Sequence, residues 1–438
     1  MDLLVLSNAG KPIYLSNPNH SPQHTGVIQA VLSVYLENQE FPRFIETETH
    51  TYAFSLRGAL YFVAISGLGH HPRALQAYLT MVHNQLIFSL SQIFTTNPGF
   101  DLASLLQGTE SHMESLSLSF QTNYTYSLDW VIPVLVPLPT SAVGDLSSLP
   151  RPDAMISGFI SVAVPEHDIL NCHSAPYHVI HQFPIRGLSS SKLNGTTLDP
   201  RDTNLLLNMI SGFSSTTRQS TWTPACLSIL DKRNFVHVYS ACRNASDASV
   251  DRKVWIVLLA ANLDAFFPLE AFEKRISRIL TLHATLDEPP RSADLASPTE
   301  PAKHLESDPL VRPYTIFTPS PALNPLLQHF IITWKERGQS SSPTTSGTAY
   351  SSREDWIRLV RVYAYASRML AGDGAESRAS VVHLSAQWEH VVAMRSVTGS
   401  GLVYFCAFNV FAGKQEMQDT VGALDRWASA RKERLFLL

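Results

Sequence analysis

The sequence predicts an α+β fold made of three successive units, each a five-stranded antiparallel sheet packed with helices. Two observations carry this prediction. The order strand–strand–helix–strand–strand–strand–helix occurs three times along the 438 residues. Consecutive strands are joined by short turns, which indicates hairpins rather than the crossovers of a doubly wound sheet. Apolar residues make up 45% of the chain, ample material for buried cores.

In the first unit, two short strands flank Asn8-Ala9-Gly10, a sequence typical of a hairpin turn. Residues 60–65 are apolar throughout, as expected for a central strand covered on both faces. Later helices are predicted to begin near Pro72, where apolar residues recur in steps of three and four, and at Asp101, a suitable N-cap. The strands are predicted at Leu3–Ser7, Pro12–Ser16, Phe41–Glu46, His50–Arg57 and Leu60–Ser66, and the first helix at about 25–37.

The second and third units repeat this order less regularly, because residues 165–200 are rich in turns and resist assignment. A helix is predicted to begin at Asp202, and an apolar stripe around Phe272 predicts the helix that closes the second unit. Strands are expected near 129–138, 155–164, 221–230, 234–241 and 254–261 in the second unit. In the third unit they are expected at 314–318, 327–334, 380–385, 388–397 and 402–408, with helices over 356–370 and around Met417.

Two segments interrupt the units. Residues 285–313 contain six prolines and no apolar periodicity, which is typical of a linker. Residues 338–352 form a Ser/Thr/Gly tract and are expected to be a mobile loop. The predicted domains are therefore residues 1–124, 127–285 and 314–438, with a Pro-rich linker over 286–313.

The charge of the chain is low and uneven. Charged residues are 16% of the total, against roughly 25% in a typical soluble protein. This suggests that another protein covers part of the surface, and the net charge of −4 excludes a strongly basic nucleic-acid binder. Residues 1–123 carry 4 bases and 8 acids, whereas residues 301–438 carry 15 bases and 12 acids. That tilt could orient the protein at an anionic membrane, or it could reflect ordinary solvated faces.

The cysteines and apolar stretches indicate a cytosolic protein. Cys172, Cys226, Cys242 and Cys406 include no close pair, which favours a reducing compartment over a disulfide framework. The N-terminal sequence lacks the basic region of an export signal. The longest apolar stretches are about half the roughly 20 residues that a membrane span needs.

Catalytic and metal-binding motifs are not found. The turn over Ser66–Arg73 contains a GxG, but Pro72 occupies the third glycine position of a dinucleotide loop, so a plain strand-to-helix turn is the better interpretation. A cluster of His167, Cys172, His173, His178 and His181 lacks the second ligand pair of a zinc site and is expected to be a flexible surface loop. No GxSxG, HExxH or GxxxxGK[ST] occurs, so we expect neither an enzyme nor a cofactor.

The first helix carries the strongest signal. Eight of the ten residues from Val27 to Leu36 are apolar, far more than a helix that covers one side of a sheet requires. We expect one side to pack on its own sheet and Val27, Val31 and Val34 to meet a partner chain or another domain. The alternative is burial within its own domain, beneath surrounding loops.

Several short motifs, in order, resemble the vacuolar fusion protein Mon-one family, also called SAND-like. The first domain carries "LSNAGKPIYLS", "GVIQAVLSV", "FSLRGALYFVAIS", "NQLIFSLSQIF" and "FDLASLLQGTE". Later segments carry "LVPLPTS", "TWTPACL", "FVHVYS", "LDAFFPL" and "RWASARKERLFLL". The match is weakest at 286–350, and the chain begins at the first strand, so the long N-terminal regulatory extension of the family is expected to be missing.

The resemblance implies three longin domains, in agreement with the three units. It implies a subunit of the guanine-nucleotide exchange factor for a late-endosomal Rab-seven-type GTPase. Such a subunit acts as a heterodimer with a Ccz-family partner in membrane fusion, autophagy and protein transport. It implies peripheral recruitment from the cytoplasm to late endosomes, lysosomes or vacuoles, and a first domain that forms the platform for the GTPase and the partner.

The resemblance also suggests contact residues. On the first hairpin and helix, we expect the GTPase to meet Lys11, Tyr14, Gln29, Ser33 and Glu37. For Tyr14, ordinary strand packing is the alternative. Trp222 is the candidate for a second contact, with an early-endosomal GTPase as its candidate partner, or else a core residue at the start of a strand. A third subunit is a further candidate partner.

Other functions remain open at this point. A longin-domain scaffold or tether without exchange activity would fit the same fold. A longin-type SNARE would need a heptad-bearing tail, a small coat-adaptor subunit would carry one such domain, and an α/β enzyme would need polar residues that converge in a cleft.

Overall fold

The structure is a computed structural model. It describes residues 1–17, 22–96, 101–106, 110–128, 131–134, 138, 140–163, 177–187, 193–213, 220–244, 253–286, 325–342, 350, 352–371 and 379–437. These residues form three sheets with helices packed on them, so the predicted α+β class is confirmed. The predicted order of elements occurs once around each sheet.

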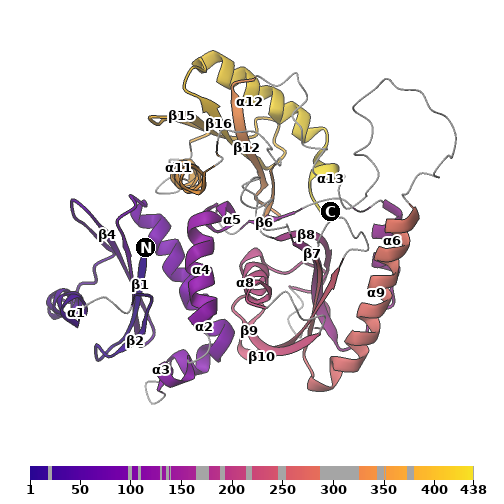
Figure 1. The fold of residues 1–438 in the computed structure, drawn as a ribbon, viewed down its shortest axis with the longest axis horizontal. Helices are drawn as coiled ribbons and strands as arrows, with labels where there is room; N and C mark the ends of the chain where they lie inside the picture. Colours follow the sequence, from indigo (N-terminus) through magenta and orange to yellow (C-terminus); the bar gives the residue numbers. More distant parts are fainter. Residues whose placement is uncertain are drawn as a thin grey trace.

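The first sheet has five antiparallel strands in the order β2-β1-β5-β4-β3. Helix α1 (Pro22–Glu37) covers one face, and α2 (Pro72–Thr96) with α4 (Glu110–Thr122) covers the other (Figure 1). The strands are β1 (Asp2–Ser7), β2 (Pro12–Leu15), β3 (Phe44–Glu46), β4 (Thr51–Arg57) and β5 (Leu60–Ser66). As its apolar sequence predicts, β5 is central and buried along its whole length.

The second sheet has the order β8-β7-β11-β10-β9. Helix α8 (Pro200–Ser211) lies on one face, and α6 (Thr140–Ser148) with α9 (Phe266–Leu286) lies on the other. The strands are β7 (Met155–Ala163), β8 (Tyr177–Phe183), β9 (Thr221–Leu227), β10 (Asp231–Asn244) and β11 (Lys253–Ala260). Strand β8 lies in the stretch that the sequence left unassigned.

The third sheet has six strands, not the five predicted, in the order β14-β15-β16-β12-β13-β6. The additional strand is β6 (Ile132–Pro133), which pairs in parallel with β13 and so leaves the second unit, where a strand over 129–138 was expected. The other strands are β12 (Leu327–Trp334), β13 (Gln339–Ser341), β14 (Val381–Ser385), β15 (Glu389–Arg395) and β16 (Leu402–Asn409), with helices α11 (Arg353–Ala371), α12 (Lys414–Ser429) and α13 (Lys432–Leu435).

Part of the Ser/Thr/Gly tract forms a strand. A turn at Gly338, with φ of 59°, returns the chain so that Gln339–Ser341 pairs with β12, which contradicts the expected loop over these three residues. The strand predicted at 314–318 and the linker at 286–313 lie outside the described residues, apart from residue 286 at the end of α9.

The units interlock through the segment that joins the first to the second. Short helices α3 (Leu102–Leu105), α5 (Tyr124–Ser127) and η1 (Leu263–Ala265) complete the described elements. Tyr124, Leu128 and Val131 pack into the core of the third unit, and the Trp356 indole donates a hydrogen bond of 2.6 Å to the Thr122 carbonyl. Contacts of this kind cross the predicted domain limits, which stay predictions. No helix in the described part of the chain combines the length and the apolar character of a membrane span.

Candidate functional site

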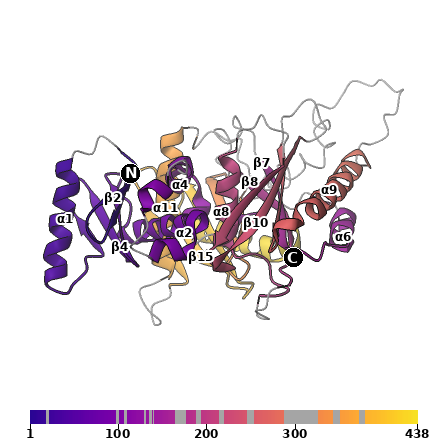
Figure 2. The ribbon, with the colours of Figure 1, turned by 90° about the horizontal axis from the view of Figure 1, so that it is seen from below.

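Helix α1 forms the outer edge of the first unit (Figures 1 and 2). Ile28 and Leu32 are buried against the sheet. On the opposite side, Val27 is 63% exposed and Val34 is 59% exposed, with half-buried Val31 beside them. We call Val27, Val31 and Val34 the α1 face. The expected packing on the sheet is present, and the alternative of burial within one domain does not hold for Val27 and Val34.

The hairpin between β1 and β2 is tied to α1. Gly10 has a φ of 80°, a conformation that glycine adopts without strain. The Gln29 side-chain amide donates a hydrogen bond to the Gly10 carbonyl. A Cβ atom at Gly10 would lie 3.1 Å from the Gln29 amide nitrogen, so the absence of a side chain permits this close approach. The hairpin tip and the helix therefore form one rigid corner.

Lys11, at the same hairpin tip, pairs with the loop that begins α3. Its Nζ lies 3.3 Å from Asp101 Oδ1, and both side chains are exposed. The Ser104 hydroxyl, followed by Lys11, holds the pKa of Asp101 below its usual value. Because the pair is solvated, we assign it an orienting role rather than a contribution to stability.

The other residues predicted to contact the GTPase do not lie together on one surface. Ser33 and Glu37 are exposed on α1, whereas Tyr14 packs against the core on the α2 side of the sheet. The structure thus brings Lys11 and Gln29 to one corner beside the α1 face. Tyr14 follows the alternative of ordinary strand packing.

Trp222 lies on β9 and is half-buried. Its ring stacks on His237 at 5.3 Å between centroids and meets Phe266 edge-on at 5.8 Å. Leu263 and Phe267, next to Phe266, are exposed. Sequence reasoning missed these two, because nothing in the pattern of η1 and α9 distinguishes an outward-facing apolar residue from a core one.

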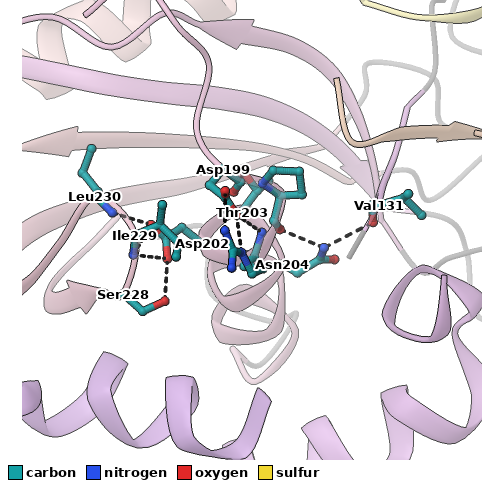
Figure 3. Close-up of polar contacts among 10 residues, drawn as sticks. Val131, Asp199, Asp202, Thr203, Asn204, Ser228, Ile229 and Leu230 are labelled. Carbon is teal, nitrogen blue, oxygen red and sulfur yellow. Dashed lines mark hydrogen bonds and ion pairs between the residues drawn. The ribbon is translucent and has the colours of Figure 1, made fainter. Parts of the chain in front are cut away.

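Helix α8 occupies in the second unit the place that α1 has in the first. Along the chain, each helix follows the second strand of its unit and precedes the third. All nine residues from Asp202 to Ile210 are buried. The Asp202 carboxylate accepts hydrogen bonds from the Ile229 and Leu230 amides and from the Ser228 hydroxyl, at 2.9–3.2 Å (Figure 3). Burial nevertheless raises the pKa of Asp202 to about 6.

The outer side of α8 is covered by the first unit. Asn208 donates hydrogen bonds of 3.1 Å to the Gln85 side chain on α2 and to the His112 carbonyl on α4, and it accepts one of 2.9 Å from Ser115. Asn204 donates to the Val131 carbonyl at 3.2 Å (Figure 3). At this position in the repeated fold, a helix is therefore covered by the helices of a neighbouring unit.

The structure describes only part of the His/Cys cluster for which the sequence predicts no zinc site. His178 and His181 are buried on β8, so the expected surface loop is wrong for them, and burial lowers the pKa of each to about 4. His167, Cys172 and His173 lie outside the described residues. The described residues contain no group of three or more His, Cys, Asp or Glu that could hold a metal ion.

The turn over Ser66–Arg73 joins an antiparallel strand to α2. Strand β5 pairs antiparallel with both β1 and β4, which is not the parallel arrangement of a dinucleotide-binding unit. The His70 ring lies 2.7 Å from the Ser66 hydroxyl in a buried contact. These contacts fit the plain strand-to-helix turn that the sequence favours.

Comparison with known proteins identifies two of the three units. Residues 1–116 match the profile described as "First Longin domain of FUZ, MON1 and HPS1", and residues 188–278 match "Second Longin domain of FUZ, MON1 and HPS1". The α1 face and the first hairpin fall within the first match.

Relatives match along the whole chain. The "Vacuolar fusion protein MON1" of Cryptococcus neoformans is 24% identical over 443 residues, which cover 99% of this chain and 64% of the relative. The human "Vacuolar fusion protein MON1 homolog A" is 23% identical over 446 residues, which cover 100% of this chain and 60% of the relative. The chain thus spans less than two thirds of the length of these relatives. On the two longin profiles and these full-chain matches, the chain belongs to the MON1 family.

Proposed function

We propose that this chain is a subunit of a guanine-nucleotide exchange factor for a late-endosomal, Rab-seven-type small GTPase, acting with a Ccz-family longin partner. The relatives' name, vacuolar fusion protein, supports the coarser part of the proposal, a role in vacuolar or endosomal trafficking. It is also consistent with peripheral recruitment to the late-endosomal, lysosomal or vacuolar membrane. The finer part rests on the geometry of the first unit.

The α1 face is the observation that carries the proposal. Val27 and Val34 expose most of their side chains on a helix that buries Ile28 and Leu32 against its own sheet. Adjacent exposed apolar side chains on one helix face support a protein contact there. The equivalent helix α8 is covered by helices of a second longin-like unit. By this internal precedent, we infer that a second longin subunit covers α1.

Exchange requires no acid, base or metal in this chain. A small GTPase that binds nucleotide at nanomolar to picomolar concentrations does so with roughly −12 to −16 kcal/mol. The exchange factor needs only to bind the opened, nucleotide-free conformer several kcal/mol more tightly than the loaded one. An interface of roughly 1,600 Å² can supply that difference by drawing a switch loop away from the nucleotide.

The rigid corner at Gly10 gives this mechanism a local basis. Because Gln29 already holds the hairpin on α1, Lys11 is presented to a partner without further ordering of the loop. Lys11 would pair with acidic groups of the GTPase, and exposed Ser33 and Glu37 would extend the contact along α1. Tyr14 would act indirectly, by supporting the hairpin from the core.

A second protein contact near Trp222 is retained as a proposal with a changed geometry. Trp222 itself is stacked on His237, so its accessible edge would form only one wall of the contact. The exposed Leu263 and Phe267 would supply the apolar anchors. An early-endosomal GTPase and a third subunit are the candidate occupants.

Release of mant-GDP from a panel of purified Rab proteins tests the proposal. We expect the chain with its Ccz-family partner to accelerate release from Rab-seven-type GTPases, and the chain alone to have little effect. If the heterodimer forms but accelerates release from no member of the panel, exchange is contradicted. The alternative of a longin scaffold or tether without exchange activity then takes its place.

A further inference from the structure

Strand β14 forms an open edge of the third sheet. It stands at the end of the strand order, so within the described part of the chain no strand pairs with its outer side. The Ala386 amide donates to the Glu389 carbonyl at 2.9 Å, which marks a hydrogen-bonded pair between β14 and β15. Hydrogen-bonded and non-hydrogen-bonded pairs alternate along an antiparallel ladder. The residues that direct their amides and carbonyls to the open edge are therefore Val381, His383 and Ser385.

The side chains of these three residues lie on one face of the sheet and are exposed. Their partners across the ladder include Val392 and Met394, which belong to the core beneath α12. Val381 is 43% exposed beside that core. The edge thus combines backbone groups that β15 does not use with side chains that a ligand can reach.

Exposed apolar side chains continue at the adjoining end of the sheet. Trp388 directly precedes β15 and Val410 directly follows β16, and these two strand ends are paired with each other. Trp388 is 61% exposed, Val410 is 38% exposed, and the next residue, Phe411, is 82% exposed. We call Trp388, Val410 and Phe411 the end patch. Large apolar side chains that are exposed next to one another support a contact with a partner.

His390 holds this end of the sheet in place. Its Nδ1 lies 3.1 Å from the Ser385 hydroxyl, and its Nε2 lies 3.2 Å from the Val410 carbonyl. The ring thereby joins the end of β14 to the segment that carries the end patch. A ligand meets a surface that is already ordered, which reduces the entropic cost of binding.

The charge of this surface is small and positive. Lys414 is the only Lys, Arg, Asp or Glu in residues 381–388 and 410–414. Glu416, the next acid along the chain, accepts a hydrogen bond of 2.9 Å from the Gly413 amide. One lysine contributes roughly 1 kcal/mol to attraction by an anionic membrane, which is little for a membrane anchor. The surface is instead complementary to an apolar protein segment that carries one carboxylate.

The opposite edge of the same sheet already accepts a strand from outside its unit. Strand β6 comes from the segment between the first and second units, and it pairs in parallel with β13. Main-chain hydrogen bonds to a sheet edge are a general means of binding an extended segment. This internal example supports a strand, rather than a helix, as the occupant of the β14 edge.

We propose that the β14 edge binds an extended, mainly apolar segment of a partner protein as an added strand. The backbone of the segment pairs with Val381 and His383, and its carboxylate meets Lys414. Its apolar side chains cover the end patch. The proposal does not depend on nucleotide exchange or on the α1 face, and it fails or succeeds separately from them.

Selection of peptides on the full chain tests the proposal. A phage-displayed library of eight-residue peptides is first depleted on the double variant Trp388→Ser/Phe411→Ser and then selected on the native chain. We expect peptides with alternating apolar residues and one acidic residue to be enriched. The tightest-binding peptide, labelled with fluorescein, is the probe for fluorescence anisotropy. The same peptide N-methylated at alternate residues should bind at least tenfold more weakly, because it lacks the backbone donors.

Two variants at one position separate the backbone edge from the side chain. His383→Pro removes an amide that points away from β15, so the ladder between β14 and β15 is kept. His383→Thr removes the imidazole and keeps the amide. We expect the proline variant to weaken binding of the probe at least tenfold and the threonine variant to change it less than about twofold. Circular dichroism melting checks that both variants fold.

Further variants test the charge and the alternative of a membrane. Lys414→Gln should weaken binding of the probe several-fold, whereas Val397→Ser, at the other end of β15, should leave it unchanged. Equal binding of the probe to the two His383 variants, or no enriched peptide, overturns the proposal. Sedimentation with phosphatidylserine vesicles that the native chain shows and Trp388→Ser/Phe411→Ser loses, without any enriched peptide, overturns it in favour of a lipid surface.

Discussion

Helices α1 and α8 occupy the same place in consecutive units, yet their surroundings are opposite. Helix α8 is buried from Asp202 to Ile210, between its own sheet and the helices of the first unit. Among the described side chains of helix α1, only Thr25, Ile28 and Leu32 are buried, and the outward Val27 and Val34 are exposed. The more polar of the two helices is therefore the buried one.

This contrast shows what each helix is built to contact. On α8, the buried Asp202, Asn204 and Asn208 are each hydrogen-bonded, so the helix is fitted to one neighbour that is already present in the chain. On α1, the outward side offers methyl groups and few polar groups, which a partner can cover without leaving a donor unpaired. The same fold position thus serves an internal contact in one unit and an open surface in the other.

Removal of the Asp202 carboxylate should have the largest effect on stability. The variant Asp202→Ala leaves the Ile229 and Leu230 amides buried without their acceptor. We expect the free energy of unfolding to fall by about 2–4 kcal/mol. Urea denaturation monitored by circular dichroism measures this loss. A change below about 1 kcal/mol would contradict the role of α8 as a fitted internal contact.

Asn208→Ala tests the contact between the first and second units more narrowly. The substitution removes the hydrogen bonds to Gln85 and to the His112 carbonyl, so we expect a loss of about 1–3 kcal/mol. Ser33→Ala, at an exposed position of α1, is the matched control and should change stability by less than about 0.5 kcal/mol. Similar losses in both variants would remove the distinction between the two helices.

The pH dependence of stability sharpens the account of Asp202. Its pKa is about 6 in the folded protein against 3.8 in the unfolded chain, so the folded state binds the proton more tightly. The contribution of this group to the free energy of unfolding therefore rises as pH falls from 7 towards 5.

Asp202→Asn cannot gain that contribution. The difference in unfolding free energy between the native chain and the variant should shift by about 1–2 kcal/mol in favour of the native chain between pH 7 and 5. Buried His178 and His181 oppose this trend, because their pKa values are lowered to about 4, but they are present in both proteins and cancel in the difference. A difference that is independent of pH would show that Asp202 keeps an ordinary pKa.

The smallest effect on stability is expected at the proposed GTPase contacts. Charge reversal at Lys11 and Glu37 should leave the thermal midpoint unchanged, since both side chains are exposed. In the reconstituted heterodimer it should slow mant-GDP release several-fold, because these residues are proposed to meet the GTPase. Unchanged release rates would remove both residues from the proposed contact.

Much of the fold could be predicted because the relevant signals are local. The apolar run of β5 and the excess of valine and leucine on α1 are each readable from one segment. The remainder depends on distant partners. Strand β6 has two residues, too few for a pattern, and forms only because β13 lies beside it. Strand β8 contains His178 and His181, which the sequence pattern did not assign to a core. Burial lowers the pKa of both, so they stay neutral inside the fold.

The candidate site shows the same division. That α1 has a second apolar side follows from its sequence, but the bond from Gln29 to Gly10 and the packing of Tyr14 against the opposite core depend on the three-dimensional arrangement. The convergence of Arg43, Arg57 and Arg73 around one pocket could not be anticipated, because they come from the bend before β3, from β4 and from α2.

Association with the Ccz-family partner tests the central claim most directly. Val27→Asp/Val34→Asp places two charges on the α1 face, and Val397→Asp, at an exposed valine 79% accessible in the third unit, is the matched control. The dissociation constant of the purified pair should rise at least 30-fold for the double variant and stay within about twofold for the control, with folding unchanged in both. Equal partner affinity of the native chain and the double variant would contradict the claim that α1 is the docking surface.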